Sequence, residues 1–470
     1  MLNIIAKRTL LGVLCVFFII KASAQQKVLS LKDAETLAIA NYGTIKARAS
    51  QLNASKSFLN ETRTEALPDL NISAQQDYGT VNGQNGPLYG YRGFAVASAG
   101  PVLGQQNWNA AFGALYLGNV SWDFFSFGKV RERIKVQNNV VTRDASDLEQ
   151  EKFQHQIRVA SVYLNLLAAQ QLAKAQQDNL NRTIDIQKVV RARVQNGLNP
   201  GVDSSLANAE VSNAKISLTN AQQTVAEQAN LLSQYMGVPP QENYSLDSVF
   251  IKKSPPTPDP QPTTNFENHP ELNFLRNVIG VSTEQEKYLH TFAYPTFSFF
   301  GTYQGRGSGF LEGYSTNPTS QYYTGNYGYG VDPTRFNYLL GVGVIWNITT
   351  PVRVHYQVES QRFTSQMYRD EYELVNQQLR DQEALAVTRI NNALKNYHEA
   401  PIEVKAATDA YNQKAALYKN GLANIIDYTT ALFTLNRAEV DLDITLNNVW
   451  QAVLSKAAAS GDLNVFMNNF

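Results

Sequence analysis

Two stretches of this chain, QNGLNPGVDSSLANAEVSNA at 195–214 and KNGLANIIDYTTALFTLNRA at 419–438, match without a gap. Both contain Asn-Gly-Leu, and a single aspartate, Asp203 in the first and Asp427 in the second, lies six residues after the glycine. Asn-Gly alone is a common turn signal. An aspartate and several alanines in the same register point further, to an internal duplication of the whole chain.

The duplication extends well beyond this motif. Residues 41–68 correspond to 268–295, and Trp122 corresponds to Trp346. We therefore expect a first structural repeat at 25–250 and a second at 267–470, the second with a short C-terminal tail. Between them, IKKSPPTPDPQPTTNF at 251–266 contains five prolines and is predicted to be an extended linker.

Residues 1–24 are predicted to be a signal peptide. Lys7 and Arg8 precede an apolar run at 9–20, and Ala-Ser-Ala follows at 22–24. The run is 12 residues long, which is too short for a transmembrane helix of about 20 residues. The only cysteine, Cys15, lies inside it. The expected mature chain therefore has no disulfide bond.

Charge and motif content argue against several functions. Removing Lys7, Arg8 and Lys21 with the signal peptide leaves 37 basic against 40 acidic residues, a net charge of −3. This balance offers no basic surface for nucleic acid. The five histidines are scattered without metal-ligand spacing, and no phosphate-binding or nucleophile motif occurs in a fitting context. We expect no catalytic residues, no cofactor and no metal site.

The helices predicted from the sequence are unusually long. Residues 129–196 contain neither glycine nor proline, and such a helix would be roughly 100 Å long. The counterpart, 352–420, is interrupted only by Pro401, where we expect a kink or a local break. Apolar residues after the second Asn-Gly motif recur at heptad-like spacings, as in coiled coils. The stripe is narrow, which favours helices that contact water on at least one side.

Four segments alternate between apolar and polar residues, near 68–78, 114–125, 295–304 and 338–348. They are predicted to be strands with one apolar face. Four strands cannot close into a barrel, and an open sheet edge is not tolerated in lipid. Two chains would supply 8 strands and three would supply 12, both even numbers within the range of outer-membrane barrels. Trp122 and Trp346, near the ends of the second and fourth strands, fit an interfacial aromatic belt.

In these features the chain resembles the TolC-like outer membrane efflux proteins. The resemblance rests on the two Asn-Gly motifs, the duplicated halves and a tryptophan-bearing strand that leads into a long helix, as in SWDFFSFGKVRERI at 121–134 and IWNITTPVRVHY at 345–356. It covers nearly the whole mature sequence. It implies a mainly α-helical homotrimer, in which a 12-stranded outer-membrane β-barrel stands on a hollow periplasmic barrel of helices.

The resemblance also implies partners. The family forms the exit duct of tripartite efflux pumps, in which a periplasmic adaptor (membrane fusion) protein connects the channel to a proton-driven or ABC-type inner-membrane pump. Small molecules are the expected cargo, and the outer-membrane lipid is the expected surroundings. A duct for type I protein secretion, a metal efflux channel and a soluble periplasmic coiled-coil scaffold are the alternatives, although a scaffold would not explain the four strands.

Site residues follow from the same resemblance. The repeated turns are predicted to be the tips of helical hairpins where the adaptor docks, through Asn196, Gly197, Leu198, Asn420, Gly421 and Leu422. A plain turn without a partner is the other interpretation. At the tips, Tyr418 and Asp203 are expected to be linked and to hold a periplasmic gate shut. The family's arginine two residues after the second glycine is replaced here by Ala423.

Asp427 matches the first of two lumen-facing aspartates of the family, while Thr430 replaces the second. Three copies of Asp427 could form an acidic ring that favours cations. Asp203 and Asp427 also suit the first turn of a helix, where a carboxylate is favourable in any protein.

Overall fold

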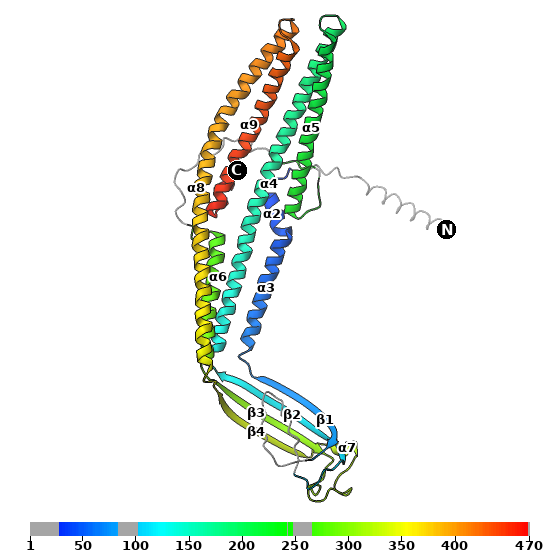
Figure 1. Ribbon diagram of the computed structural model, residues 1–470, viewed down its shortest axis with the longest axis vertical. Helices are drawn as coiled ribbons and strands as arrows, with labels where there is room; N and C mark the ends of the chain where they lie inside the picture. Colours follow the sequence, from blue (N-terminus) through cyan, green and yellow to red (C-terminus); the bar gives the residue numbers. More distant parts are fainter. Residues whose placement is uncertain (1–27, 83–101, 242, 248–265, 469–470) are drawn as a thin grey trace, which may run out of the picture. The chain divides into compact units, whose positions relative to one another are not determined.

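The computed structural model describes residues 28–82, 102–241, 243–247 and 266–468 (Figure 1). The chain divides into two compact units. Unit 1 comprises Met1–Leu52, Asp144–Arg276 and Asp370–Phe470, and unit 2 comprises Asn53–Arg143 and Asn277–Arg369. Each unit takes segments from both sequence repeats, so a repeat is not itself a compact body. The predicted signal peptide at 1–24 and all but the last residue of the predicted linker at 251–266 lie outside the described residues.

Long helices dominate the chain. Unit 1 contains α2 (Leu31–Asn41), α5 (Gly201–Met236), α9 (Ile425–Ser460) and α10 (Asn464–Met467). Four further helices contribute residues to both units: α3 (Gly43–Thr64), α4 (Lys129–Gln195), α6 (Pro270–His290) and α8 (Thr350–Lys419). The helix α8 continues through Pro401, so the local break considered from the sequence does not occur there. Among the described residues, no helix is both long enough and apolar enough to cross a membrane.

The core of unit 1 lies where α2, α4, α5 and α9 meet. Val159, Leu166 and Leu232 are fully buried in it, together with Trp450, whose ring meets that of Phe466 edge-on. The buried Tyr163 hydroxyl donates a hydrogen bond of 2.8 Å to the Leu29 carbonyl. This contact anchors the chain entering α2 to α4.

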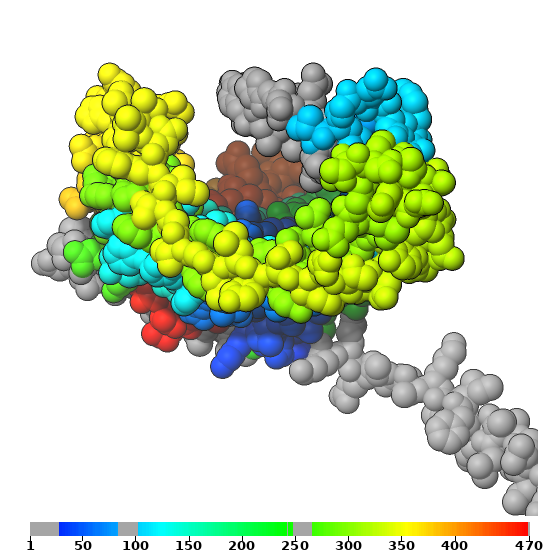
Figure 2. All heavy atoms as spheres, turned by 90° about the horizontal axis from the view of Figure 1, so that it is seen from below, coloured from blue at the N-terminus to red at the C-terminus, as the bar shows by residue number. Residues whose placement is uncertain are grey.

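Unit 2 contains one antiparallel sheet in the order β1-β2-β3-β4. The strands are β1 (Asp69–Thr80), β2 (Ala110–Phe125), β3 (Thr296–Ser308) and β4 (Arg335–Ile345). The mainly helical fold with four strands per chain is therefore confirmed. A short 3-10 turn (Thr291–Ala293) precedes β3, and the connection from β3 to β4 carries the helix α7 (Tyr327–Val331). Figure 2 shows residues of this connection, in yellow-green, as a thick mass at the end of the sheet.

The pairing register gives the sheet two different faces, because residues that pair directly in an antiparallel sheet lie on the same face. One face, here called the apolar face, carries aliphatic and aromatic side chains from all four strands: Leu70, Ile72, Val120, Trp122, Phe299, Tyr303, Tyr338, Leu340, Val342 and Val344. Ile72 is 86% exposed and Leu340 is 64% exposed. The other face carries polar residues such as Asn71, Asn119 and Thr302.

The end of α5 provides a test of the packing in unit 1. Gly237 has φ +64°, and a Cβ there would lie 2.9–3.0 Å from atoms of Asn41 in α2. We expect Gly237→Ala to destabilise the protein by about 1–2 kcal/mol from the left-handed backbone alone, with the close contact adding to this cost. The midpoint of thermal unfolding, followed by circular dichroism, should fall.

Gly43→Ala is the matched control, because a Cβ at Gly43 meets nothing within 4 Å. Its unfolding midpoint should stay the same or rise slightly, since alanine favours a helix over glycine. Equal midpoints for the two variants would contradict the packing described for Gly237.

Candidate functional site: the hairpin tips and the tryptophan end of the sheet

Two helical hairpins, α4 with α5 and α8 with α9, each end in a short tip, at 196–200 and 420–424 (Figure 1). Both tips use the same backbone arrangement. The Gly197 N–H bonds to the Val194 carbonyl, and the Leu198 N–H bonds to the Arg193 carbonyl. In the second tip, Gly421 and Leu422 form the same pair of bonds to α8. This is the Schellman motif, which ends a helix by placing a glycine in the left-handed conformation.

Glycine alone provides the reversal at each tip. Gly197 has φ +72° and Gly421 has φ +78°, whereas Asn196 and Asn420 are not among the described residues with positive φ. The glycine of each Asn-Gly pair therefore forms the turn expected there. Asn420 instead donates its side-chain amide to the Ala416 carbonyl.

All six predicted docking residues lie on the surface of unit 1. Asn196, Gly197, Asn420 and Gly421 are exposed. Leu198 is 66% exposed and Leu422 is 75% exposed, which is high for leucine. The two tips thus display a matching pair of apolar side chains without a partner among the described residues. A docking role for them remains a prediction.

The predicted gate pair, Tyr418 and Asp203, is brought together by a third residue. Asn199 donates its side-chain amide to Asp203 Oδ2 at 2.7 Å and to the Tyr418 hydroxyl at 3.4 Å. The Tyr418 ring is only 1% exposed, and its centroid lies 5.4 Å from that of Tyr428. Burial, with the nearby charge of Asp203, raises the pKa of the Tyr418 phenol. Tyr418 therefore stays neutral and able to form hydrogen bonds at physiological pH.

Arg193 is a contact residue that the sequence comparison missed. Its guanidinium donates to Asn199 Oδ1 at 2.8 Å and to the Lys419 carbonyl at 3.0 Å. It also lies 5.4 Å from the centroid of the Tyr418 ring, within reach of a cation–π interaction. We call this set of interactions the tip contact (Arg193, Asn199, Asp203, Tyr418 and the Lys419 carbonyl). It joins the first hairpin to the second.

The repeat itself explains why Arg193 was overlooked. Its counterpart in the second copy is Leu417, so a search for identities between the copies passes over it. The arginine expected at Ala423 is absent, but a different arginine, from the other hairpin, lies between the tips. The signal available in the sequence was this difference, a cation in one copy where the other has an apolar residue.

Asp427 lies in the first turn of α9, where its backbone N–H bonds to the capping Asn424 side chain at 2.8 Å. Its carboxylate forms an ion pair of 3.1 Å with Lys414. Both side chains are more than 40% exposed, and exposed pairs of this kind contribute about 0–1 kcal/mol. The structure therefore gives Asp427 a helix-terminal position and a cationic neighbour. The acidic ring remains a prediction.

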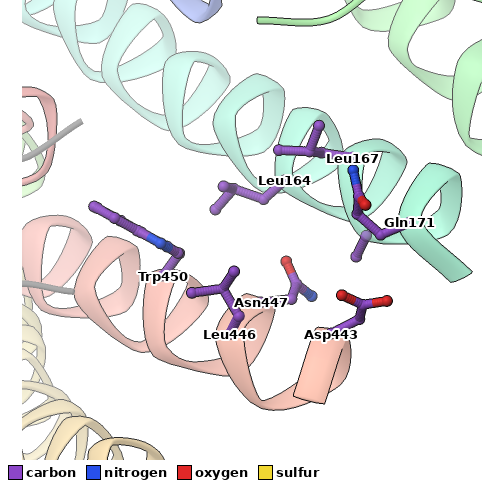
Figure 3. Close-up of a pocket in the computed structure, with 8 residues that line it drawn as sticks. Leu164, Leu167, Gln171, Asp443, Leu446, Asn447 and Trp450 are labelled. Atoms are coloured by element: carbon purple, nitrogen blue, oxygen red, sulfur yellow. The ribbon is translucent and has the colours of Figure 1, made fainter. Parts of the chain in front are cut away.

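A cavity between α4 and α9 is too small to be a substrate site (Figure 3). It has a volume of about 20 Å³ and is lined by Leu164, Leu167, Leu446 and Trp450, with polar Asp443 at its edge. Such a space holds about one water molecule. Burial and the charge of Glu439 raise the pKa of Asp443 to about 6. Within the described part of the chain, no group of three His, Cys, Asp or Glu side chains could hold a metal ion.

The two predicted belt tryptophans make equivalent contacts in unit 2. Trp122 donates its indole N–H to the Ala66 carbonyl at 2.9 Å, and Trp346 donates to the Ala293 carbonyl at 3.1 Å. Ala66 lies just before β1, and Ala293 lies just before β3. Trp122 is 41% exposed and Trp346 is 55% exposed. Each ring therefore combines a satisfied polar group with an accessible apolar surface, as tryptophans at membrane interfaces do.

Other aromatic rings surround this end of the sheet. Phe127 stacks on Tyr294 with a centroid distance of 5.2 Å, and Phe125 contacts Phe297. Phe127 itself has φ +48°, an uncommon value for a residue with a side chain. The turn from β2 into α4 is thus fixed by ring packing.

Solved structures share this fold. The chain is similar to the outer membrane protein VceC of Vibrio cholerae (16% identity, 92% of this chain and 96% of that chain covered, TM-score 0.70). It is also similar to the CmeC outer membrane channel of Campylobacter jejuni (14% identity, 92% of this chain and 85% of that chain covered, TM-score 0.74). A third similar structure is the open state of the MtrE outer membrane channel of Neisseria gonorrhoeae (14% identity, 92% of this chain and 89% of that chain covered, TM-score 0.69). No curated protein is significantly similar in sequence.

Residues 36–238 match the model of the outer membrane efflux protein family. Over these residues the chain is similar to the outer membrane efflux proteins. The resemblance to TolC-like proteins expected from the sequence is confirmed, and the family and its structural neighbours are channels, not enzymes. The matched region includes the first tip and Trp122, and the second tip and Trp346 repeat their geometry.

The indole hydrogen bonds can be tested through stability. Trp122→Phe keeps an aromatic ring and removes the donor to Ala66. We expect a loss of about 1 kcal/mol, the usual net contribution of one hydrogen bond, measured as a lower midpoint of thermal unfolding in detergent.

Trp108→Phe serves as the control, because the Trp108 ring is 80% exposed and should contribute little. If Trp122→Phe and Trp108→Phe unfold at the same temperature as the unchanged protein, the indole bond does not stabilise the end of the sheet.

Proposed function

We propose that this protein is the outer-membrane exit duct of a tripartite efflux pump and passes small molecules outward. The observation that carries the proposal is the sheet of unit 2. Its apolar face is exposed on all four strands, while β1 and β4 form its two edges. A single chain in water would leave that face and both edges unsatisfied.

A trimer in a membrane satisfies both requirements. If β4 of one protomer pairs with β1 of the next, three chains close a 12-stranded barrel without edges, and lipid covers the apolar face. The strands contain 12, 16, 13 and 11 residues. A tilted membrane-spanning strand needs about 9–11 residues, so each is long enough.

The tips of unit 1 suit contact with a partner protein in the periplasm. Leu198 and Leu422 are apolar, exposed and carried on hydrogen-bonded turns, so a partner could bury both of them. We propose that a periplasmic adaptor protein docks there and connects the channel to an inner-membrane pump. The two matching tips of each protomer would give six equivalent docking points in a trimer.

In the same proposal, the tip contact keeps the channel closed until the adaptor engages. It combines charge-assisted hydrogen bonds with a buried tyrosine, and these are worth more than exposed ion pairs. Asp203 participates through Asn199, and Tyr418 through its ring and hydroxyl. Opening would require the two hairpins to separate at this point.

The first test is electron microscopy of the protein extracted from outer membranes in mild detergent, together with export of a dye by cells. Three-fold hollow particles and dye export that depends on the protein would support the proposal. A monomer, or a protein absent from that membrane, would overturn it.

The gate can be tested in planar bilayers. Arg193→Ala removes the guanidinium and should raise single-channel conductance or open probability. Losing contacts worth about 2 kcal/mol shifts an open-to-closed ratio roughly 30-fold. Arg191→Ala is the matched control, because within the described part of the chain Arg191 bonds only to Asn208 of the neighbouring α5, at 3.4 Å. Equal conductance for both variants would show that the tip contact does not hold the channel closed.

Docking can be tested separately. Leu198→Glu together with Leu422→Glu keeps both glycines and both turns, and places charges where an apolar anchor is proposed. We expect adaptor affinity to fall by at least about tenfold, as for the loss of an interface hot spot, and export to stop while trimers still assemble.

Ile216→Glu is the control for docking. Ile216 is 60% exposed on α5 but lies away from the tips, so its variant should bind the adaptor and export normally. Normal export by the Leu198, Leu422 double variant would remove the docking assignment.

A further inference from the structure

The connection between β3 and β4 folds back over part of the apolar face. We call its last part the α7 flap (residues 326–333), since it contains α7 and its flanks. Asn326 caps the helix by accepting the Tyr329 N–H at 3.1 Å. The flap therefore has a defined conformation of its own.

Side chains of the sheet hold the flap in place. The Tyr327 hydroxyl donates to Gln76 Oε1 at 2.6 Å, and the Tyr116 hydroxyl donates to the Val331 carbonyl at 3.1 Å. The Phe112 ring meets Tyr327 edge-on at a centroid distance of 5.2 Å. In the pairing register, Gln76, Phe112 and Tyr116 all belong to the apolar face. The flap thus packs on the same face as Leu70 and Ile72, nearer the loop end of the strands.

Glycines make this packing possible. A Cβ at Gly307 of β3 would lie 2.6 Å from the Asp332 carbonyl oxygen. A Cβ at Gly330 would lie 2.5 Å from the Phe112 carbonyl oxygen. The backbone of the flap and that of the sheet are therefore in direct contact, and a larger residue at either position would separate them.

The flap ends the apolar face with tyrosines. Tyr327 and Tyr329 are 52% and 54% exposed, and Tyr78 of β1, on the same face, is 61% exposed. Tyrosine combines an apolar ring with a hydroxyl, and it gathers at the boundary between lipid and water. At the other end of the same face lie Trp122 and Trp346. The apolar face is thus bounded by an aromatic group at each end.

The distance between these groups can be estimated from the register. Phe112, which contacts the flap, and Trp122 are ten residues apart on β2. Ten residues of strand extend roughly 33 Å. At a tilt of about 45° this gives about 23 Å along the membrane normal, close to the apolar band of about 25 Å in outer-membrane barrels.

We propose that the α7 flap is a membrane-contact element, in which Tyr327 and Tyr329 lie in the headgroup region of the lipid surface at the end of the sheet opposite Trp122 and Trp346. This inference rests on the proposed outer-membrane function. We assign lipid as the occupant for two reasons. The flap is continuous with the exposed apolar face, and its distance from the tryptophans matches the thickness of the apolar band of an outer-membrane barrel.

The test measures depth with nitroxide labels in lipid vesicles containing the trimer. The only native cysteine, Cys15, lies in the predicted signal peptide, so single cysteines can be introduced into the mature chain. Ile72→Cys should report the hydrocarbon interior, Asn317→Cys, on the distal part of the connection, should report water, and Tyr329→Cys should report an intermediate depth. Depth is read from the ratio of oxygen to nickel-complex collisions.

Two outcomes overturn the proposal in different ways. A label at 329 as accessible to nickel as the label at 317, with 72 still in lipid, would overturn the flap contact alone. A label at 72 in water would overturn the membrane function together with the inference.

Displacing the flap gives a second readout. Gly307→Ala in the Tyr329→Cys protein should move the label toward water, because the added methyl group meets the Asp332 carbonyl. Gly118→Ala, on the same face of β2 with nothing within 4 Å of its Cβ, should leave the label unchanged. If the label lies at the same depth in both variants, the contact between the flap and the sheet does not determine the position of residue 329.

Discussion

The structure depends on a sheet that one chain cannot complete. Four antiparallel strands expose an apolar face and end in two edges, β1 and β4, whose backbone groups still need partners. Water is a poor solvent for the face, and lipid is a worse one for the edges. The proposed trimer in a membrane would satisfy both, because closure removes the edges and lipid covers the face. The two sequence repeats are consistent with it, because each repeat contributes one pair of strands.

The two hairpin tips have equivalent turns, which come from the duplicated sequence. Both end their first helix with a left-handed glycine, which fixes the direction of the returning helix and exposes one leucine. Between these equivalent turns lies an asymmetric contact, since Arg193 and Asn199 of the first hairpin act on Tyr418 and Lys419 of the second. The duplicated turns thus display two similar exposed surfaces, and one asymmetric contact joins them.

Much of this could be predicted from the sequence, because it depends on local and periodic features. Helix length followed from the absence of glycine and proline, and the strands followed from alternation. The tips followed from a repeated Asn-Gly pair, in which only the glycine has positive φ. The contacts of Arg193, Asn199 and the α7 flap could not be predicted, because each joins segments that are distant in the sequence; the sequence marked Arg193 only as a difference between the two copies. Pro401 lies inside the continuous helix α8 without a break, where it removes one backbone hydrogen bond.

The bond between the two tips at residue 419 does not depend on the side chain of that residue. Arg193 bonds to the backbone carbonyl of Lys419, not to its side chain. Every amino acid supplies that carbonyl, so the interaction persists when residue 419 changes. If a partner docks there as proposed, the surface around the second tip can vary while the contact that joins the hairpins persists. Docking and closure, as proposed, would then place separate demands on a site only a few residues long.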